Sequence, residues 1–186
     1  MIRARRIARG DAPRGYKIGF TNRTIWPRYG VFAPIWAPVW HSTLTLLEGS
    51  EATVSLAGLV QPRLEPEIVF GFAAPPRAGM SDAELLGCIE WVAHGFEIVH
   101  THFADWRFTA ADTVADFALH GRLVVGPRVP VARFGWLGDE LAGLQLALQH
   151  QHVVHHQEGQ RHRGRGRHRP GRAAGEISGG WSRISR

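Results

Sequence analysis

Residues 64–72 read Leu-Glu-Pro-Glu-Ile-Val-Phe-Gly-Phe, an alternation that is typical of a half-buried β-strand. Successive side chains of a strand point to opposite faces, so the apolar residues face one way while Glu65 and Glu67 face the other. Two neighbouring carboxylates repel each other unless solvent or a cation screens them. The pair is therefore either part of a solvated outer face or a candidate site for a hard divalent metal bound through oxygen.

Strands are expected to dominate the chain on both sides of this segment. Short runs rich in β-branched and aromatic residues, bounded by glycine, proline or asparagine, are predicted as strands. They are residues 16–20, 43–47, 52–56, 64–72, 96–103, 122–125 and 144–148.

Two helices are predicted from their capping residues. Ser81 and Glu84 form a capping box, and apolar residues then recur at helical spacing until Gly95 offers a left-handed end. Thr109 opens a shorter helix in the same way, ending near Gly121. The sequence therefore predicts a strand-rich α+β fold with two short packing helices, and it contains no glycine-rich nucleotide motif.

Charge is distributed unevenly over the 186 residues. The formal net charge is +6, and residues 150–186 account for it with eight arginines against two glutamates, so the first 149 residues carry no net charge. The basic character of the chain is therefore no evidence that its body binds nucleic acid or a membrane surface.

The composition also bounds the setting of the protein. The hydrophobic content of 44% with seven tryptophans is enough for a core, and the longest apolar run, residues 31–40, covers about half a membrane span and contains two prolines. No apolar segment of the kind found in secretory signals follows the basic N-terminus, and Cys88, the only cysteine, cannot form an intrachain disulfide. We therefore expect a cytoplasmic protein without a transmembrane helix.

Three segments differ in composition. Residues 1–14 form an arginine-rich stub, residues 15–149 form the body, and residues 150–186 form a tail of Arg, His and Gly. Such a tail cannot build a core, so we expect it to be disordered and to pack against nothing. The abrupt change after Gln149 is typical of a frameshift in a GC-rich gene; the alternative is a basic tail that binds nucleic acid through its charge.

Further candidate residues surround the two glutamates in the sequence. Glu97 offers a third carboxylate for a metal, or is an ordinary acid at a helix-strand junction. Lys17, the only lysine, offers a compact positive charge for a carboxylate, or is a surface residue. His100 and His102 would alternate onto one strand face, where packing is as good an explanation as metal binding, and Asp105 is a catalytic candidate or a turn residue.

Several of these segments together are similar to a known enzyme family. They are Gly15-Tyr-Lys-Ile-Gly-Phe-Thr-Asn22, Pro62-Arg-Leu-Glu-Pro-Glu67, Glu97-Ile-Val, Ala104-Asp-Trp-Arg-Phe-Thr-Ala-Ala-Asp-Thr-Val-Ala-Asp116 and Gly138-Asp-Glu-Leu141. In this order they resemble the 2-keto-4-pentenoate hydratase and 4-oxalocrotonate decarboxylase family of the fumarylacetoacetate hydrolase superfamily. The resemblance extends from about residue 15 to about residue 148.

The resemblance implies a fold of mixed β-sheets in a sandwich or roll, with Mg²⁺ or Mn²⁺ at its open end. It maps the metal ligands onto Glu65, Glu67 and Glu97, and it makes Lys17 and Asp105 the catalytic candidates. The implied reaction adds water to a 2-hydroxy-2,4-dienoate, of the 2-keto-4-pentenoate type, to give a 4-hydroxy-2-oxo acid in aromatic catabolism. The alternative within the family is decarboxylation of a vinylogous 2-oxo acid of the 4-oxalocrotonate type.

The chain also departs from the family pattern. Relatives have a longer N-terminal region, and they continue after Leu148 with strands that the tail replaces. His41 stands where an acidic residue is expected. We therefore expect a partial catalytic domain with slow turnover, or a non-catalytic fragment. The expected partners are a small 2-oxo or 2-hydroxydienoic acid and, for the intact protein, further copies of the chain, but neither a membrane nor nucleic acid.

Overall fold

The computed structural model describes residues 2–144, 153–154 and 176–180. Its helices are α1 (Ile2–Ala8), α2 (Trp26–Tyr29), α3 (Asp82–Gly87), α4 (Ala110–Ala115) and α5 (Leu137–Ala142). Its strands are β1 (Pro13–Gly19), β2 (Ile35–Trp40), β3 (Leu44–Leu46), β4 (Glu51–Ser55), β5 (Arg63–Phe72), β6 (Ile89–Val99), β7 (His120–Val125), β8 (Val129–Pro130), β9 (Val153–Val154) and β10 (Glu176–Gly180). The predicted strand-rich α+β class is confirmed.

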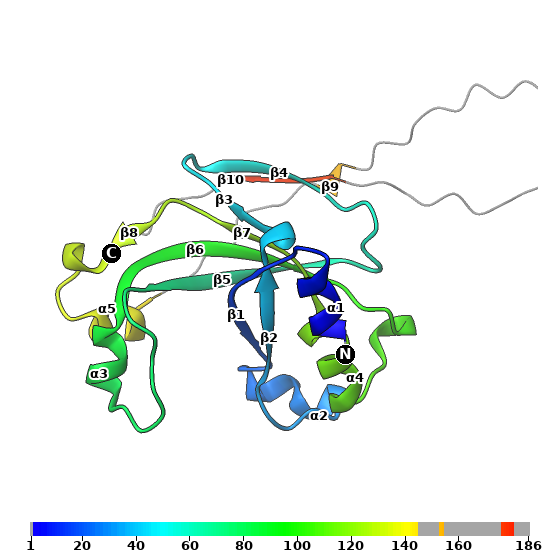
Figure 1. The fold of residues 1–186 in the computed structure, drawn as a ribbon, viewed down its shortest axis with the longest axis horizontal. Coiled ribbons are helices and arrows are strands. Elements are labelled where there is room, and N and C mark those ends of the chain that lie inside the picture. Colours follow the sequence, from blue (N-terminus) through cyan, green and yellow to red (C-terminus); the bar gives the residue numbers. More distant parts are fainter. Residues whose placement is uncertain (1, 145–152, 155–175, 181–186) are drawn as a thin grey trace, which may run out of the picture.

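The main sheet has the strand order β3-β7-β6-β5, and β8 pairs with the far end of β6. β3 and β7 are parallel, whereas β5, β6 and β7 are antiparallel neighbours. β5 and β6 are the longest strands and form a curved hairpin that spans the width of the molecule (Figure 1). This hairpin carries the glutamates that the sequence analysis singled out.

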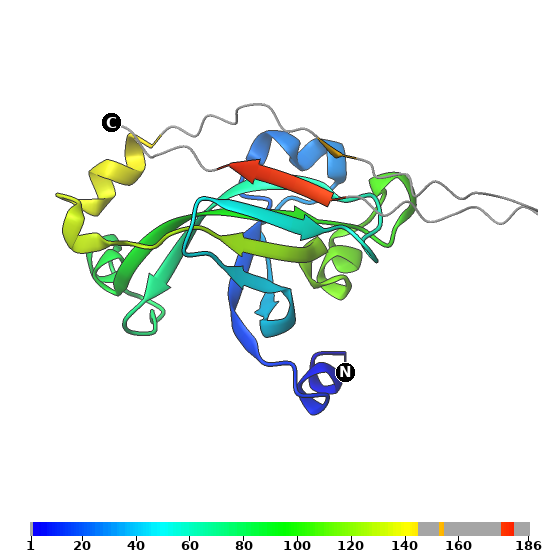
Figure 2. The same cartoon turned by 90° about the horizontal axis from the view of Figure 1, so that it is seen from above.

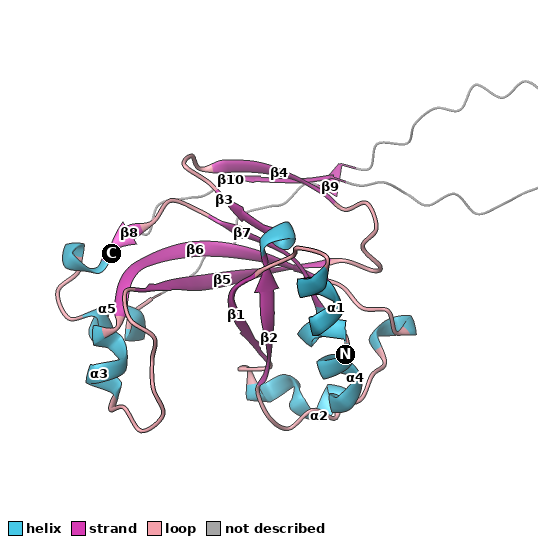
Figure 3. Ribbon diagram, viewed as in Figure 1, coloured by secondary structure: helices cyan, strands magenta, loops and turns pink. Residues whose placement is uncertain are grey.

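Two smaller sheets lie on opposite sides of the main sheet. The antiparallel ribbon β1–β2 crosses it on one side, and β4 lies on the other side with β10 and β9 (Figure 1). The helices gather on the ribbon side and at one end of the β5–β6 hairpin (Figure 3), and α1 projects away from the sheets when the molecule is viewed from above (Figure 2). None of the helices in the described ranges is both long and apolar enough to cross a bilayer.

The core lies between the β1–β2 ribbon and the main sheet. One cluster joins Val31, Ile35 and Ala37 to Ala118, with partly buried aromatic side chains packed around it. A second cluster joins Val99, Trp106 and Leu119. Burial of these apolar side chains fixes the ribbon against the sheet, which brings Lys17 of β1 close to Glu97, near the end of β6.

The first predicted helix is correct at its start and wrong at its end. The capping box forms, with Ser81 N donating to Glu84 Oε2 at 2.8 Å and Glu84 N donating to Ser81 Oγ at 3.4 Å. The helix stops at Gly87, however, and the apolar residues from Ile89 onward belong to β6. Strand pairing explains the difference, because β6 has hydrogen-bonded neighbours on both edges and buries most of its side chains there.

Other element boundaries also change. The strand expected at 96–103 begins at Ile89 and ends at Val99, and the helix after Thr109 ends at Ala115 rather than near Gly121. β2 was not predicted, although it forms most of the apolar run at 31–40. It contains Pro38, and a proline within an apolar run weakens the signal for a strand. The strand expected at 144–148 does not include Leu144, and the rest of it lies outside the described residues.

The stub begins with a helix, and part of the tail differs from the expectation. Within residues 1–14, α1 forms, and the Arg6 guanidinium lies 2.8 Å from Asp11 and 4.6 Å from the centre of the Trp40 ring. In the tail, β10 pairs with β4 and with β9. The expectation that the tail packs against nothing is therefore wrong for these two short segments, and the remaining tail lies outside the described residues.

Candidate metal centre

The three glutamates converge because of the register between β5 and β6. Glu65 is directly opposite Glu97, and Glu67 is opposite Gly95. Directly paired residues of an antiparallel ladder share a face, so all three carboxylates lie on one side of the hairpin. One carboxylate oxygen from each lies within 4.8 Å of the others, and they form the only such group of three acidic, histidine or cysteine side chains among the described residues.

Gly95 keeps space open inside this cluster. A Cβ at that position would lie 2.7 Å from Val69 Cγ2 and 3.4 Å from the Glu67 Cβ. Any larger residue would push against the strand that carries Glu67. The glycine therefore lets β5 and β6 approach closely at the point where the carboxylates meet.

Both oxygens of Glu97 are already bound by side chains from other elements. Lys17 Nζ, from β1, lies 2.9 Å from Oε2, and His120 Nδ1, from β7, lies 2.8 Å from Oε1. An ionised carboxylate can only accept, so His120 donates from Nδ1. Its Nε2 lies 2.8 Å from Oγ1 of Thr43, the residue just before β3. The chain thus orients one buried carboxylate with a lysine and a threonine-supported histidine.

A β-bulge turns His120 toward Glu97. Glu97 pairs with Leu123 and Ile98 with Arg122, but Val99 then pairs with His120, so Gly121 is the extra residue. Without that extra residue His120 would face the other side of the sheet. A Cβ on Gly121 would lie 2.5 Å from the Ile98 carbonyl oxygen, so only glycine fits there.

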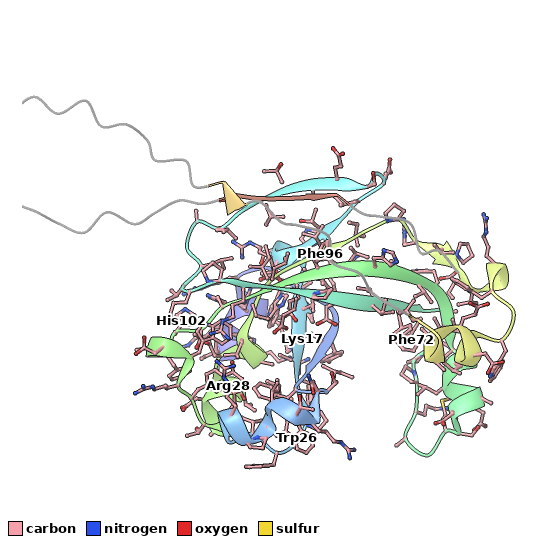
Figure 4. The ribbon with its side chains drawn as sticks, turned by 180° about the vertical axis from the view of Figure 1, so that it is seen from behind. Lys17, Trp26, Arg28, Phe72, Phe96 and His102 are labelled. Atoms are coloured by element: carbon pink, nitrogen blue, oxygen red, sulfur yellow. The ribbon has the colours of Figure 1, made fainter. Side chains whose placement is uncertain are left out.

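A left-handed turn presents the second partner of Lys17. Phe117, Ala118 and Leu119 have φ values of 50°, 53° and 64°, a conformation that costs about 1–2 kcal/mol per residue. The turn is kept in place because Ala118 and Leu119 are buried in the core. Lys17 lies on the ribbon side of the main sheet (Figure 4). The Ala118 carbonyl oxygen accepts a hydrogen bond from Lys17 Nζ at 3.0 Å, which holds the ammonium beside Glu97.

The carboxylates raise one another's affinity for protons. Burial raises the pKa of Glu67 to about 7, with the neighbouring Glu97 and Glu65 charges adding to it and Lys17 opposing it. Burial likewise raises the pKa of Glu65, which Lys17 and Arg63 partly counteract. One lysine does not neutralise three carboxylates, of which Glu97 is buried, Glu67 is half-buried and Glu65 is exposed, so the cluster favours an added cation.

Asp105 and the two histidines lie apart from this cluster. Asp105 lines a neighbouring cavity of about 300 Å³ with Arg28 and Arg107, whereas Lys17 and Glu65 line a smaller one of about 80 Å³. His100 and His102 follow β6 rather than lying on it; their ring centroids are 4.8 Å apart, and His102 pairs with Asp116. They do not join the glutamate group.

His120 and Thr43 were missed by the sequence analysis. Periodicity could not have found His120, because a bulge reverses the face that alternation assigns to it. The available signal was Gly121 at the start of a strand, since an isolated glycine in a strand pattern often marks a bulge.

Comparisons with known proteins identify relatives of the chain. No family profile matches it. A 4-oxalocrotonate decarboxylase from a Pseudomonas species is 34% identical over 139 residues, which are 73% of this chain and 53% of that protein. A 2-hydroxyhexa-2,4-dienoate hydratase from Comamonas testosteroni is 35% identical over 127 residues, 68% of this chain and 47% of that protein. The chain is homologous to these hydratases and decarboxylases.

A solved structure supports the same relationship. The 4-oxalocrotonate decarboxylase from Pseudomonas putida G7, complexed with magnesium and adipate, superposes with a TM-score of 0.63 and 25% identity over 72% of this chain and 50% of that chain. A 2-keto-4-pentenoate hydratase from Paraburkholderia xenovorans is 32% identical over 77% of this chain and 52% of that protein. The resemblance to the hydratase and decarboxylase family that the sequence analysis described is therefore confirmed. This chain spans about half the length of the curated proteins it matches.

Proposed function

We propose that the protein is a divalent-metal-dependent hydratase that adds water to a 2-hydroxy-2,4-dienoate and gives a 4-hydroxy-2-oxo acid. The observation that carries the proposal is the group of Glu65, Glu67 and Glu97 with Lys17 at 2.9 Å from Glu97. Relatives named as hydratases of such acids support it, among them a 2-hydroxypent-2,4-dienoate hydratase from Pseudomonas putida that is 33% identical.

The residues fit the cofactor, Mg²⁺ or Mn²⁺, that the resemblance implies. Three carboxylates offer only hard oxygen donors, which these ions prefer, and the pKa of Glu67, raised to about 7, marks a cluster short of positive charge. Glu65, Glu67 and Glu97 would hold the ion. When bound, it would supply Lewis-acid stabilisation of negative charge on the substrate oxygen.

The chain's own side chains suggest a division of roles. Lys17 uses one N–H for Glu97 and one for the Ala118 carbonyl, so its third N–H is available to a substrate carboxylate or to proton transfer. His120 keeps Glu97 in one orientation. Asp105, in the adjoining cavity, is proposed as the base that takes a proton from the attacking water.

The fold type, the oligomeric state and the location of the protein are also proposals. We infer a fold of the fumarylacetoacetate hydrolase type from the TM-score of 0.63. We infer that the intact protein forms a homo-oligomer, because Tyr16, Ile18 and Trp36 expose more than half of their surface on one face of the β1–β2 ribbon. The single cysteine of the sequence supports a location in the cytoplasm.

The test is the reaction itself. The purified chain is incubated with 2-hydroxypenta-2,4-dienoate and Mg²⁺ or Mn²⁺, and the loss of dienol absorbance and the formation of 4-hydroxy-2-oxopentanoate are followed. We expect metal-dependent product formation that Glu65→Gln abolishes and that Glu51→Gln, an exposed change on β4, leaves intact. Dienol loss without the hydroxy product, or product without metal, would contradict the proposal.

Decarboxylation is the second candidate because the solved relative is a 4-oxalocrotonate decarboxylase. The same carboxylates and Lys17 would serve it, since both reactions develop negative charge on the 2-oxygen of the substrate. Release of CO₂ from 4-oxalocrotonate, measured beside hydration of the dienoate, separates the two. A rate of CO₂ release above the hydration rate would reverse their order.

A further inference from the structure

One arginine attaches helix α1 to the rest of the molecule. Helix α1 projects away from the sheets (Figure 2), and within Ile2–Ala8 only Arg6 is half-buried, whereas the other residues are exposed. Arg6 Nε lies 2.8 Å from Asp11 Oδ2, and Arg6 Nη2 donates to Ser42 Oγ at 3.2 Å. The Ser42 hydroxyl in turn donates to Asp11 at 2.8 Å. These bonds use the edge of the guanidinium and leave its flat face available for stacking.

The Arg6 guanidinium lies over two aromatic rings. Its central carbon is 4.6 Å from the centre of the Trp40 ring and 5.6 Å from that of Phe117. The two rings meet edge to face, with centroids 5.7 Å apart and planes at 84°. Trp40 is fully buried, and its Nε1 has no hydrogen-bond partner among the described residues. The orientation of the indole therefore depends on its packing against Phe117 and on the cation above it.

Trp40 supports one oxygen of Glu97 through two intermediate residues. The backbone N of Trp40 donates to Thr43 Oγ1 at 3.3 Å, and the Trp40 carbonyl oxygen lies 3.2 Å from the same hydroxyl. Thr43 Oγ1 lies 2.8 Å from His120 Nε2, and His120 Nδ1 lies 2.8 Å from Glu97 Oε1. A displacement of Trp40 therefore moves the support of Oε1.

Phe117 supports the other oxygen of Glu97. It opens the left-handed turn that continues with Ala118, and their φ values are 50° and 53°. The Ala118 carbonyl oxygen accepts from Lys17 Nζ at 3.0 Å, and Nζ lies 2.9 Å from Glu97 Oε2. A strained turn persists only where its surroundings hold it, and Arg6 contacts the Phe117 ring. Release of that ring therefore loosens the carbonyl that fixes Lys17.

We propose that Arg6 is a positioning residue of the metal centre. By holding the two aromatic rings, it sets both supports of the Glu97 carboxylate. The inference rests on the proposed function, because Glu97 is a metal ligand there, and it adds a residue of helix α1 to that site. A guanidinium suits this task, since its edge binds a carboxylate while its face stacks on an indole.

The first experiment observes the support of Glu97 without metal. In metal-free protein the proton on His120 Nδ1 should give a resolved downfield NMR signal, because it lies in a buried hydrogen bond to a carboxylate. His120→Ala, which lacks the signal, assigns it. Arg6→Gln should shift this signal and speed its exchange with water about tenfold, the loss expected for one cation–π contact. Arg6→Lys keeps a cation over the rings and should restore most of the protection.

The second experiment measures the affinity for Mn²⁺ by electron paramagnetic resonance of the free ion. Arg6→Gln should lower the affinity about fivefold, because both supports of Glu97 loosen, yet by less than the ~10-fold typical of a direct partner of a ligand. Arg6→Lys should recover most of it. Arg5→Gln removes the same charge from an exposed position of the same helix and should change neither the affinity nor the His120 signal.

The outcomes separate a positioning role from a structural one. If Arg6→Gln lowers only the free energy of unfolding and keeps the wild-type His120 signal and Mn²⁺ affinity, Arg6 merely anchors α1 and this inference is overturned. Equal losses in Arg5→Gln would overturn it too, and both results leave the proposed function standing. Wild-type protein that binds no Mn²⁺ would overturn both, since there would be no metal ligand to position.

Discussion

Two acid-histidine pairs of nearly equal length occur in the described chain. His120 Nδ1 lies 2.8 Å from Glu97 Oε1, and the side chains are 1% and 2% exposed. His102 Nδ1 lies 2.7 Å from Asp116 Oδ1, and the side chains are 60% and 12% exposed. Distance alone would rank the pairs as equal, but water screens the second pair and not the first.

The pairs also differ in what holds the histidine. His120 is held at both ring nitrogens, by Glu97 and by Thr43, and a bulge in the sheet sets its side. His102 binds Asp116 through Nδ1 and through its own backbone N–H, and its ring otherwise lies against that of His100. A buried, doubly held imidazole is suited to position a metal ligand, whereas an exposed one adds little.

The largest difference is expected in metal binding. Glu97→Gln removes one ligand charge and replaces one of the two oxygens that accept from Lys17 and His120 with an NH2 group, so the affinity for Mn²⁺ should fall on the order of 100-fold or more. Asp116→Asn, at the exposed pair, should leave that affinity unchanged. Electron paramagnetic resonance of free Mn²⁺ measures both constants. Equal losses in the two variants would mean that the glutamate cluster is not the metal centre.

The next largest difference between the two pairs is expected in the free energy of unfolding. His120→Ala leaves the buried Glu97 Oε1 without its donor, while Thr43 Oγ1 keeps its contacts with the Trp40 backbone, so the change should cost about 2 kcal/mol of unfolding free energy. His102→Ala removes an exposed pair and should cost less than about 1 kcal/mol. Urea unfolding followed by tryptophan fluorescence gives both values. A larger loss for His102→Ala would show that burial does not set the strength of these pairs.

Part of this site was predictable from sequence because it depends on local alternation. The Glu65-Pro66-Glu67 pattern predicts that both carboxylates share a face, which the β5 register bears out. The Ser81 and Thr109 capping boxes likewise form as predicted. Capping and alternation involve only neighbouring residues, so the sequence carries them directly.

The remainder depends on contacts between distant segments. Residues from Ile89 onward fit a helical pattern, but pairing with β5 and β7 makes them a strand. His120 reaches Glu97 only through a bulge that Gly121 permits. Asp105 lines the cavity with Arg28 and Arg107, which come from a distant and a neighbouring part of the sequence. The roles of Lys17, Asp105 and the three glutamates stay predictions until metal and substrate are bound.

The pH dependence of Mn²⁺ affinity at the glutamate cluster is expected to be an effect of intermediate size. Burial and the charges of Glu97 and Glu65 raise the pKa of Glu67 to about 7, although Lys17 opposes this increase. Protons therefore compete with the metal for the Glu67 carboxylate below neutral pH. Mn²⁺ affinity should therefore rise about tenfold from pH 6 to pH 8, because one proton must leave. Without metal the sign reverses: a folded-state pKa above the unfolded value makes stability decline between about pH 4.5 and 7.

Titrations of Mn²⁺ at several pH values and urea unfolding of the metal-free protein test both directions. Glu67→Gln removes the titrating group and should flatten both profiles. A metal-free protein that becomes more stable over this interval would contradict the raised pKa of Glu67.

The smallest effect on Mn²⁺ affinity should come from a change of Thr43, which contacts the ring of His120 and not that of His102. Thr43→Val keeps the shape of the side chain but removes the hydroxyl 2.8 Å from His120 Nε2, so the buried ring becomes, like that of His102, held mainly by its carboxylate. We expect a loss of about 1 kcal/mol in unfolding free energy, the usual value of one hydrogen bond. Because His120 then orients Glu97 less strictly, Mn²⁺ affinity should fall about threefold, less than the ~10-fold typical of a direct partner of a ligand. Thr43→Ser retains the hydroxyl and should restore the affinity even if the missing methyl group lowers stability. If Thr43→Val keeps the Mn²⁺ affinity and Thr43→Ser lowers it, Thr43 acts through packing alone and His120 needs no second support.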